Sequence, residues 1–189
     1  QDIKFIKVRD KMPDEVVLNE ACSSGCGSLL SGFAWSFNIK MRDFVARAIK
    51  AEKPVDLGTR CTVFMTSRVR HAQKEGASLG DISAGLAYSV VKNALYKVIR
   101  VPDIERIGRT IVVQGGTFKN DAVLRAFEKL CRKNVIRPDA SEYMGAYGAA
   151  LLAQERKRNE GMSSLLSEEK IKKLKSKQTT FRCELCMNN

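Results

Sequence analysis

The chain has 189 residues, 44% of them hydrophobic, with 33 Lys and Arg against 21 Asp and Glu, for a net charge of +12. This length suits one domain with an appendage, and no apolar run approaches the roughly 18 to 20 residues that span a bilayer. The composition therefore excludes a membrane-spanning protein, and we expect a soluble, cytoplasmic one.

The first element expected is a β-hairpin. Apolar and polar residues alternate over 3–8, a turn is expected at 10–14, and the apolar residues 16–18 follow it. A loop rich in Ser, Gly and Cys follows at 22–28, and apolar residues then recur at helical spacing. The elements expected next are helices at 29–37 and 43–51, a short strand or extended link at 61–64, and a helix at 67–75.

The longest periodic stretch, 81–99, predicts a helix. Beyond it we expect a strand at 110–114, the paired glycines Gly115 and Gly116, a helix at 120–131, a strand at 135–137 and a small-residue helix from 145 to about 155. Because strands and helices interleave in the second half, the fold class is α/β or α+β.

The last part of the chain is rich in charge. Residues 155–182 hold nine basic and four acidic side chains, and few apolar residues remain to pack a weak helix face. We therefore predict a domain over 1–157 and a basic helical tail over 158–189. A nucleic-acid-binding tail is one reading, but Phe181 is the only aromatic residue in it, so stacking on bases is poorly supported and such a partner is not expected.

Two glycine loops could each approach a nucleotide. A strand that ends in Gly115-Gly116 before a helix lets the backbone come close to a ligand, and it is equally a tight structural turn. The loop 23–28 offers hydroxyls, glycines and a helix start, the features of an anion-binding loop, but it lacks the Lys-Ser/Thr ending of a Walker motif.

The six cysteines are scattered, which argues against a secreted disulfide framework and leaves metal binding, redox chemistry or burial. Cys22 and Cys61 are 39 residues apart, each where an apolar stretch meets a polar loop, so they are half of a four-thiolate site or two buried thiols. Cys26 is a possible third ligand or a neighbour of the nucleotide. Cys131 falls on an apolar helix phase and is expected in the core.

The CxxC formed by Cys183 and Cys186 has the tightest metal-ligand spacing in the chain. It is half of a zinc or cluster site, a redox pair, or two thiols in a disordered end. The single histidine, His71, is expected on a solvated helix face. Four carboxylates are candidates for positioning magnesium or water, namely Asp2, Asp56, Asp81 and Asp121, although Asp81 is better explained as a helix cap.

Several stretches together resemble one family, the activators of 2-hydroxyacyl-CoA dehydratases and the related ATPase subunits of benzoyl-CoA reductase, the BadF/BadG/BcrA/BcrD type. The matching stretches, in family order, are Gln1-Asp2-Ile3-Lys4, the loop 19–27, the second cysteine motif 55–64, the turn 113–120 and the small-residue helix 144–150.

The resemblance implies an ATPase fold of the actin, sugar kinase and Hsp70 type (ribonuclease H-like), built from two related halves with the nucleotide between them. The matching motifs are those of the second half, so we expect the chain to be a fragment whose first half lies upstream of Gln1. The sequence of the Cys22 loop and the CxxC near the end of the chain resemble the large, multidomain activase-related proteins more than the short activators.

The resemblance also implies cofactors and roles. Two subunits would share one [4Fe-4S] cluster, with Cys22 and Cys61 as the ligands from each, and ATP would drive electron transfer to a partner dehydratase. Gln1 and Asp2 would be catalytic, with Asp2 positioning Mg2+ or the attacking water. The nucleotide would be bound by Ser23, Ser24, Gly25 and Gly27 near the phosphates and by Gly115, Gly116 and Asn120 at the adenosine.

Two other functions remain open on the residues alone. A sugar or acetate kinase-like phosphotransferase of the same fold would need no cysteine at positions 22 and 61. A basic nucleic-acid-binding module would use the tail and bind in a steeply salt-dependent way.

Overall fold

The structure is a computed structural model that describes residues 3–18, 27–59, 62–100, 107–160, 166–177 and 179. The chain divides into two compact units, one ending at Tyr147 and the other beginning at Gly148. The helix α6 (Met144–Glu160) contributes to both units, and the predicted domain boundary near residue 158 stays a prediction. No helix in the described part of the chain is both long and apolar enough to cross a membrane.

The first unit begins with the predicted hairpin, in which β1 (Lys4–Arg9) pairs antiparallel with β2 (Met12–Leu18). Its turn is tighter than expected. Asp10 and Lys11 adopt φ of 52° and 65° and make a two-residue connection, so Met12 and Pro13 already belong to β2. The register shifts between Lys7 and Val8, which lets Pro13 pair with Val8 at the irregularity.

Three helices follow, α1 (Gly27–Ser36), α2 (Met41–Ile49) and α3 (Thr62–Lys74). The first two confirm the predicted helices within two residues at the start. The strand or extended link expected at 61–64 is wrong for the described residues, because α3 already includes Thr62 to Phe64. The apolar residues Met65, Val69 and Ala72 are almost fully buried at helical spacing, so packing sets this segment as helix.

The central helix is α4 (Leu79–Asn93), continued by one π-helical turn (Ala94–Val98). It begins two residues before the prediction because Ser78, not Asp81, is the N-cap. The Ser78 hydroxyl accepts the amide of Asp81 at 3.0 Å and donates to the Asp81 carboxylate at 2.6 Å. Its apolar residues Ile82, Leu86, Val90 and Leu95 are buried.

The strand, glycine turn and helix unit is also present. The short strand β3 (Ile111–Val112) leads through Gly115 into a 3-10 turn (Gly116–Lys119) and then α5 (Asp121–Cys131). β4 (Val135–Ile136) pairs with β3 in parallel, Ile111 opposite Val135 and Val112 opposite Ile136. Both strands are shorter than predicted.

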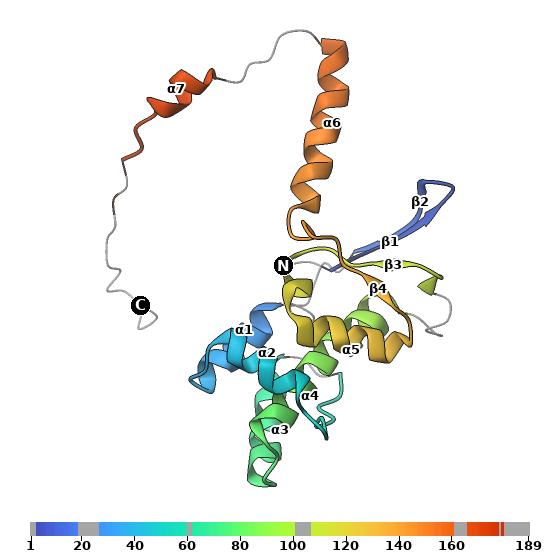
Figure 1. The fold of residues 1–189 in the computed structure, drawn as a ribbon, viewed down its shortest axis with the longest axis vertical. Coiled ribbons are helices and arrows are strands. Elements are labelled where there is room, and N and C mark those ends of the chain that lie inside the picture. Colours follow the sequence, from blue (N-terminus) through green and yellow to red (C-terminus); the bar gives the residue numbers. More distant parts are fainter. Residues whose placement is uncertain are drawn as a thin grey trace. The chain divides into compact units, whose positions relative to one another are not determined.

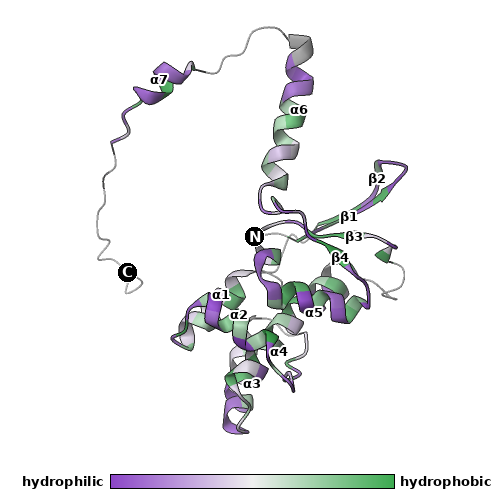
Figure 2. Cartoon of the chain, viewed as in Figure 1, coloured by the Kyte–Doolittle hydropathy of each residue, from purple (hydrophilic) through white to green (hydrophobic). Residues whose placement is uncertain are grey.

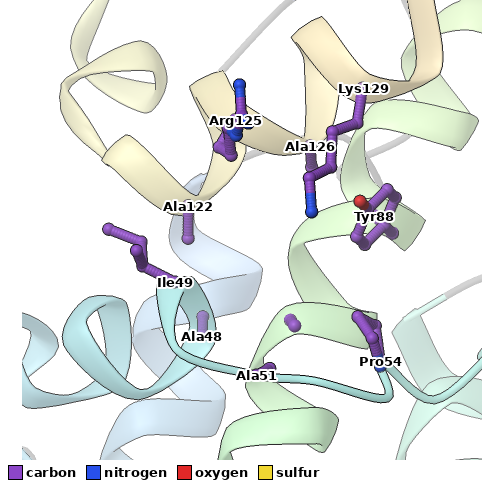
Figure 3. A pocket seen from close by; sticks show the side chains of 10 residues that line it. Ala48, Ile49, Ala51, Pro54, Tyr88, Ala122, Arg125, Ala126 and Lys129 are labelled. Carbon is purple, nitrogen blue, oxygen red and sulfur yellow. The ribbon is translucent and has the colours of Figure 1, made fainter.

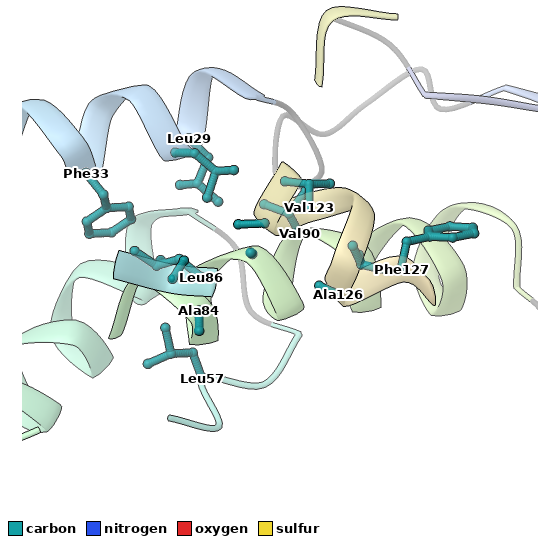
Figure 4. Packing of buried hydrophobic residues seen from close by; sticks show 14 of the residues in the cluster. Leu29, Phe33, Leu57, Ala84, Leu86, Val90, Val123, Ala126 and Phe127 are labelled. Carbon is teal, nitrogen blue, oxygen red and sulfur yellow. The ribbon is translucent and has the colours of Figure 1, made fainter. Parts of the chain in front are cut away.

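The core of this unit lies where α2, α4 and α5 pack together, with α1 and α3 beside them (Figure 1). Leu29 and Phe33 of α1 face Leu86 of α4, and Val123 of α5 lies close to Val90 (Figure 4). Cys131 belongs to this core with 3% of its surface exposed, which confirms the prediction for that residue.

In the second unit, α6 continues to Glu160 and is exposed along most of its described length. The described part of the predicted tail contains the short helix α7 (Glu168–Lys172), which buries no residue and is largely hydrophilic (Figure 2). Residues 166–177 therefore contribute charge and little packing.

Candidate functional site

Two of the loops predicted to bind nucleotide lie in contact. The amide of Gly27, the first residue of α1, donates to the hydroxyl oxygen Oγ1 of Thr117 at 3.3 Å. Thr117 is the second residue of the 3-10 turn that follows Gly115. The end of the Ser/Gly/Cys loop is thus joined to the paired-glycine turn across 90 residues of sequence.

The paired glycines form an open turn. Gly115 has φ of 94°, in the region where a side chain is strained, so this position requires glycine. A Cβ on Gly116 would meet no other atom within 4 Å, and the residue is exposed. The backbone here is therefore open to close approach by a ligand.

Hydrogen bonds and an ion pair fix the glycine turn to the segment that leads from β4 into α6. Gly115 donates its amide to the carbonyl of Ser141 at 2.8 Å. Arg137 donates from Nη1 to the carbonyl of Phe118 at 2.9 Å and to Asp121 Oδ1 at 2.7 Å. Lys119 forms an ion pair with Glu142, and this hydrogen bond lowers the pKa of the Glu142 carboxyl. The turn is fixed before any ligand arrives.

Asn120 has a structural role in addition to its predicted one. Its Oδ1 accepts the amides of Ala122 at 3.0 Å and Val123 at 3.3 Å, which caps α5. Its Nδ2 lies 3.8 Å from the sulfur of Met41. The predicted contact of Asn120 with adenosine stays a prediction.

The remaining predicted site residues lie outside the described residues. These are Gln1, Asp2, Cys22, Ser23, Ser24, Gly25, Cys26, Cys61, Cys183 and Cys186. Among the residues that are described, no group of three or more His, Cys, Asp and Glu side chains is placed to hold a metal ion.

The stretch that leads to Cys61 is anchored along α4. Ser89 donates its hydroxyl to the carbonyl of Gly58 at 2.7 Å, and Lys92 Nζ lies 2.8 Å from Asp56 Oδ1. The Lys92 hydrogen bond and the Gly58 amide lower the pKa of Asp56. The first residues of the second cysteine motif are therefore held against α4.

The three candidate carboxylates that the structure describes all have protein partners, which favours a structural role for each. Asp56 pairs with Lys92, Asp81 accepts the Lys53 amide at 2.9 Å as well as the Ser78 hydroxyl, and Asp121 pairs with Arg137. His71 is exposed, as predicted, with Nδ1 at 3.2 Å from Glu75 Oε2.

A small cavity lies between the end of α2, α4 and α5 (Figure 3). Arg125 and Lys129 of α5 and Tyr88 of α4 border it, and burial raises the pKa of the Tyr88 hydroxyl. Its volume of about 30 Å³ suits a water molecule rather than a nucleotide. The open glycine turn is the better candidate site.

Sequence reasoning missed the residues that assemble the site. Thr117 joins the two loops, Arg137 fixes the turn, and Gly85 of α4 lies against the backbone of Val55. The role of Gly85 could have been predicted, because a glycine inside a strongly periodic helix indicates a close approach by another segment. The sequence carried no such signal for Thr117 and Arg137.

Two solved structures have a fold similar to that of this chain. The chain is similar to the solved activator of the 2-hydroxyisocaproyl-CoA dehydratase from Clostridium difficile with bound ADPNP, with TM-score 0.72 and 27% identity over 95% of this chain and 62% of that one. It is also similar to the (R)-2-hydroxyglutaryl-CoA dehydratase component A from Acidaminococcus fermentans, with TM-score 0.73 and 29% identity over 82% and 59%. These likenesses confirm the predicted α/β, actin-like ATPase fold.

The curated sequences agree with this result. The 2-hydroxyisocaproyl-CoA dehydratase activator of Clostridioides difficile is 30% identical over 81% of this chain, and the (R)-2-hydroxyglutaryl-CoA dehydratase activating ATPase of Acidaminococcus fermentans is 30% identical over 82%. The chain spans only 56% and 58% of these two relatives. A sequence profile of the BadF/BadG/BcrA/BcrD ATPase family matches residues 1–153. The chain therefore belongs to the BadF/BadG/BcrA/BcrD ATPase family, as the motifs predicted.

Proposed function

We propose that this chain is part of a cytoplasmic, ATP-dependent activator that transfers an electron from a [4Fe-4S] cluster to a 2-hydroxyacyl-CoA dehydratase or a related reductase-like partner. The observation that carries the proposal is the contact between Gly27 and Thr117, which joins two loops expected to hold one nucleotide. Relatives named as activators of such dehydratases, and the neighbour solved with ADPNP, support it. The proposal concerns the whole protein, since the chain spans just over half of those relatives.

The nucleotide would bind across the joined loops. Gly115 and Gly116 leave the backbone open, so a flat purine ring can approach it, with Asn120 at the end of the same turn. Ser23, Ser24, Gly25 and Gly27 would lie at the phosphates, because the start of a helix such as α1 favours negative charge. Gln1 and Asp2 would supply oxygen atoms for Mg2+ or for the attacking water, because magnesium prefers carboxylate and carbonyl ligands.

The cluster would be held by Cys22 and Cys61. Thiolates are the usual ligands of iron–sulfur clusters, so the donor chemistry fits the group. A helix begins shortly after each cysteine, α1 at Gly27 and α3 at Thr62. Amides at such helix starts can donate hydrogen bonds to sulfur and tune the reduction potential.

Two cysteines are half of a four-ligand site, so we propose that a homodimer holds one cluster between its two subunits. When bound, the cluster would supply one-electron transfer to the partner. Residues of this chain would position the thiolates and couple them to the nucleotide. Cys183 and Cys186 would form a separate, incomplete site.

An activation assay tests the proposal. Full-length protein, purified and reconstituted without oxygen, is mixed with a reductant and an inactive 2-hydroxyacyl-CoA dehydratase. We expect dehydratase activity to appear only when ATP is added, with ATP hydrolysed in the process. Phosphorylation of a sugar or carboxylate by an iron-free protein would favour a kinase of the same fold and contradict the proposal.

The open turn gives a further test. Replacing Gly116 by alanine should weaken ATP binding by about tenfold or more, because the added methyl group stands where the ligand approaches the backbone. The melting temperature should change little, since that Cβ meets no protein atom within 4 Å. Titration calorimetry measures the affinity.

Gly32→Ala, at an exposed position of α1 with open space around it, is the matched control and should bind ATP as the wild type does. Equal affinity of Gly116→Ala and wild type would place the nucleotide elsewhere.

A further inference from the structure

The start of α1 is capped by a residue from a distant segment. The amide of Gly27 is one of the first four in α1, and no carbonyl within the helix can accept their protons. The hydroxyl of Thr117 accepts it at 3.3 Å, although Thr117 lies 90 residues further along the chain. A Cβ on Gly27 would lie 3.2 Å from the same oxygen, so the two segments touch at this point.

The residues around Thr117 are fixed to the body of the first unit. Gly115 is bound to the Ser141 carbonyl, the Phe118 carbonyl accepts Arg137, and the Phe118 ring packs edge-on against Phe127 at 5.6 Å. Lys119 is paired with Glu142. Within this turn, the Thr117 side chain contacts the first residue of α1.

A threonine hydroxyl suits such a connection. It can accept the amide proton of Gly27 and, at the same time, donate its own proton to another acceptor. Thr117 directly follows the open Gly115-Gly116 backbone, where a nucleotide would supply oxygen and nitrogen acceptors. One neutral hydrogen bond is also weak enough to be strengthened or broken by a ligand.

We propose that Thr117 is the positioning residue through which nucleotide binding at the Gly115-Gly116 turn acts on the start of α1, which follows the cysteine loop in the sequence. The inference rests on the proposed function, which places the nucleotide at this turn. Thr117 transmits the occupancy of the turn because its hydroxyl is bonded to α1 while its backbone belongs to the turn.

The test compares Thr117→Val with Thr117→Ser in the full-length protein. Valine keeps the shape and removes the acceptor, whereas serine keeps the hydroxyl. Hydrogen exchange of the peptide that covers the first turn of α1 is measured by mass spectrometry with and without ADPNP. Thermal melting confirms that both variants are folded.

We expect this peptide to exchange about fivefold faster in Thr117→Val than in the wild type without nucleotide. ADPNP should change its exchange in the wild type and in Thr117→Ser, and should no longer do so in Thr117→Val at saturating ADPNP. A wild-type response to ADPNP in Thr117→Val would overturn the inference. Failure of the wild type to bind ADPNP at all would contradict the proposed function itself, and the role of Thr117 with it.

Discussion

Replacing Gly85 by alanine is expected to lower the free energy of unfolding by about 3 kcal/mol, near the upper end of the range for overpacking a core. Gly85 lies in the middle of α4, where the backbone of the segment 55–58 passes directly over it. A Cβ at this position would overlap the carbonyl oxygen of Val55 and lie 3.2 Å from its carbonyl carbon. A backbone group cannot rotate away as a flexible side chain can.

The segment that would be displaced is well anchored. The Val55 amide donates to the Asp81 carbonyl at 3.1 Å, Ser89 holds the Gly58 carbonyl, and Lys92 holds Asp56. Leu57 is 2% exposed in the core. Because the same segment leads to Cys61, we also expect Gly85→Ala to disturb the second cysteine motif.

Urea denaturation of wild type and variant measures the effect. Gly32→Ala is the matched control, because glycine in an exposed helix interior is less favourable than alanine by up to about 1 kcal/mol and nothing there obstructs the methyl group. The two substitutions should therefore change stability in opposite directions. Equal stability of Gly85→Ala and wild type would show that the segment over α4 is not packed as the structure has it.

Replacing Cys61 by serine is expected to abolish cluster assembly under the proposed function. A hydroxyl is a poor substitute for a thiolate, and each subunit would keep only one of its two ligands. Anaerobic reconstitution with iron and sulfide should give broad visible absorption and about one cluster per two chains in the wild type. The variant should remain colourless.

Cys131→Ser is the matched control for this experiment. The Cys131 thiol is buried in the core at the end of α5, and burial raises its pKa to about 11. Because the thiol is enclosed in the core, it is not placed to reach a cluster between two subunits. Cys131→Ser should keep the full iron content, with some loss of stability. Full iron content in Cys61→Ser would remove Cys61 from the ligand set.

Most helices could be predicted from the sequence because their apolar residues recur at the helical period over a long stretch. This holds for α4 and α5, whose buried faces include Ile82, Leu86, Val123 and Phe127. The start of α3 could not be predicted in this way. Thr62, Val63 and Phe64 favour extended structure locally, whereas burial of Met65 and Val69 against the core determines the helix.

The sequence predicted the separate loops of the candidate site but not the contacts between them. The glycine pairs and the cysteine loops are local patterns, and the turn with Gly115, Gly116 and Asn120 lies where the pattern placed it. The contact between Gly27 and Thr117 depends on how α1 packs, which no local pattern contains. The hold of Arg137 on the Phe118 carbonyl likewise depends on β4 lying beside β3.

We propose that nucleotide binding at the glycine turn controls a cluster held by Cys22 and Cys61. The decisive experiment measures the midpoint potential of the cluster in anaerobically reconstituted full-length protein, titrated with and without ADPNP. We expect ADPNP to make the midpoint potential more negative, so that the electron can be passed from the cluster to the partner. An identical potential in both titrations, with ADPNP shown to be bound, would contradict it.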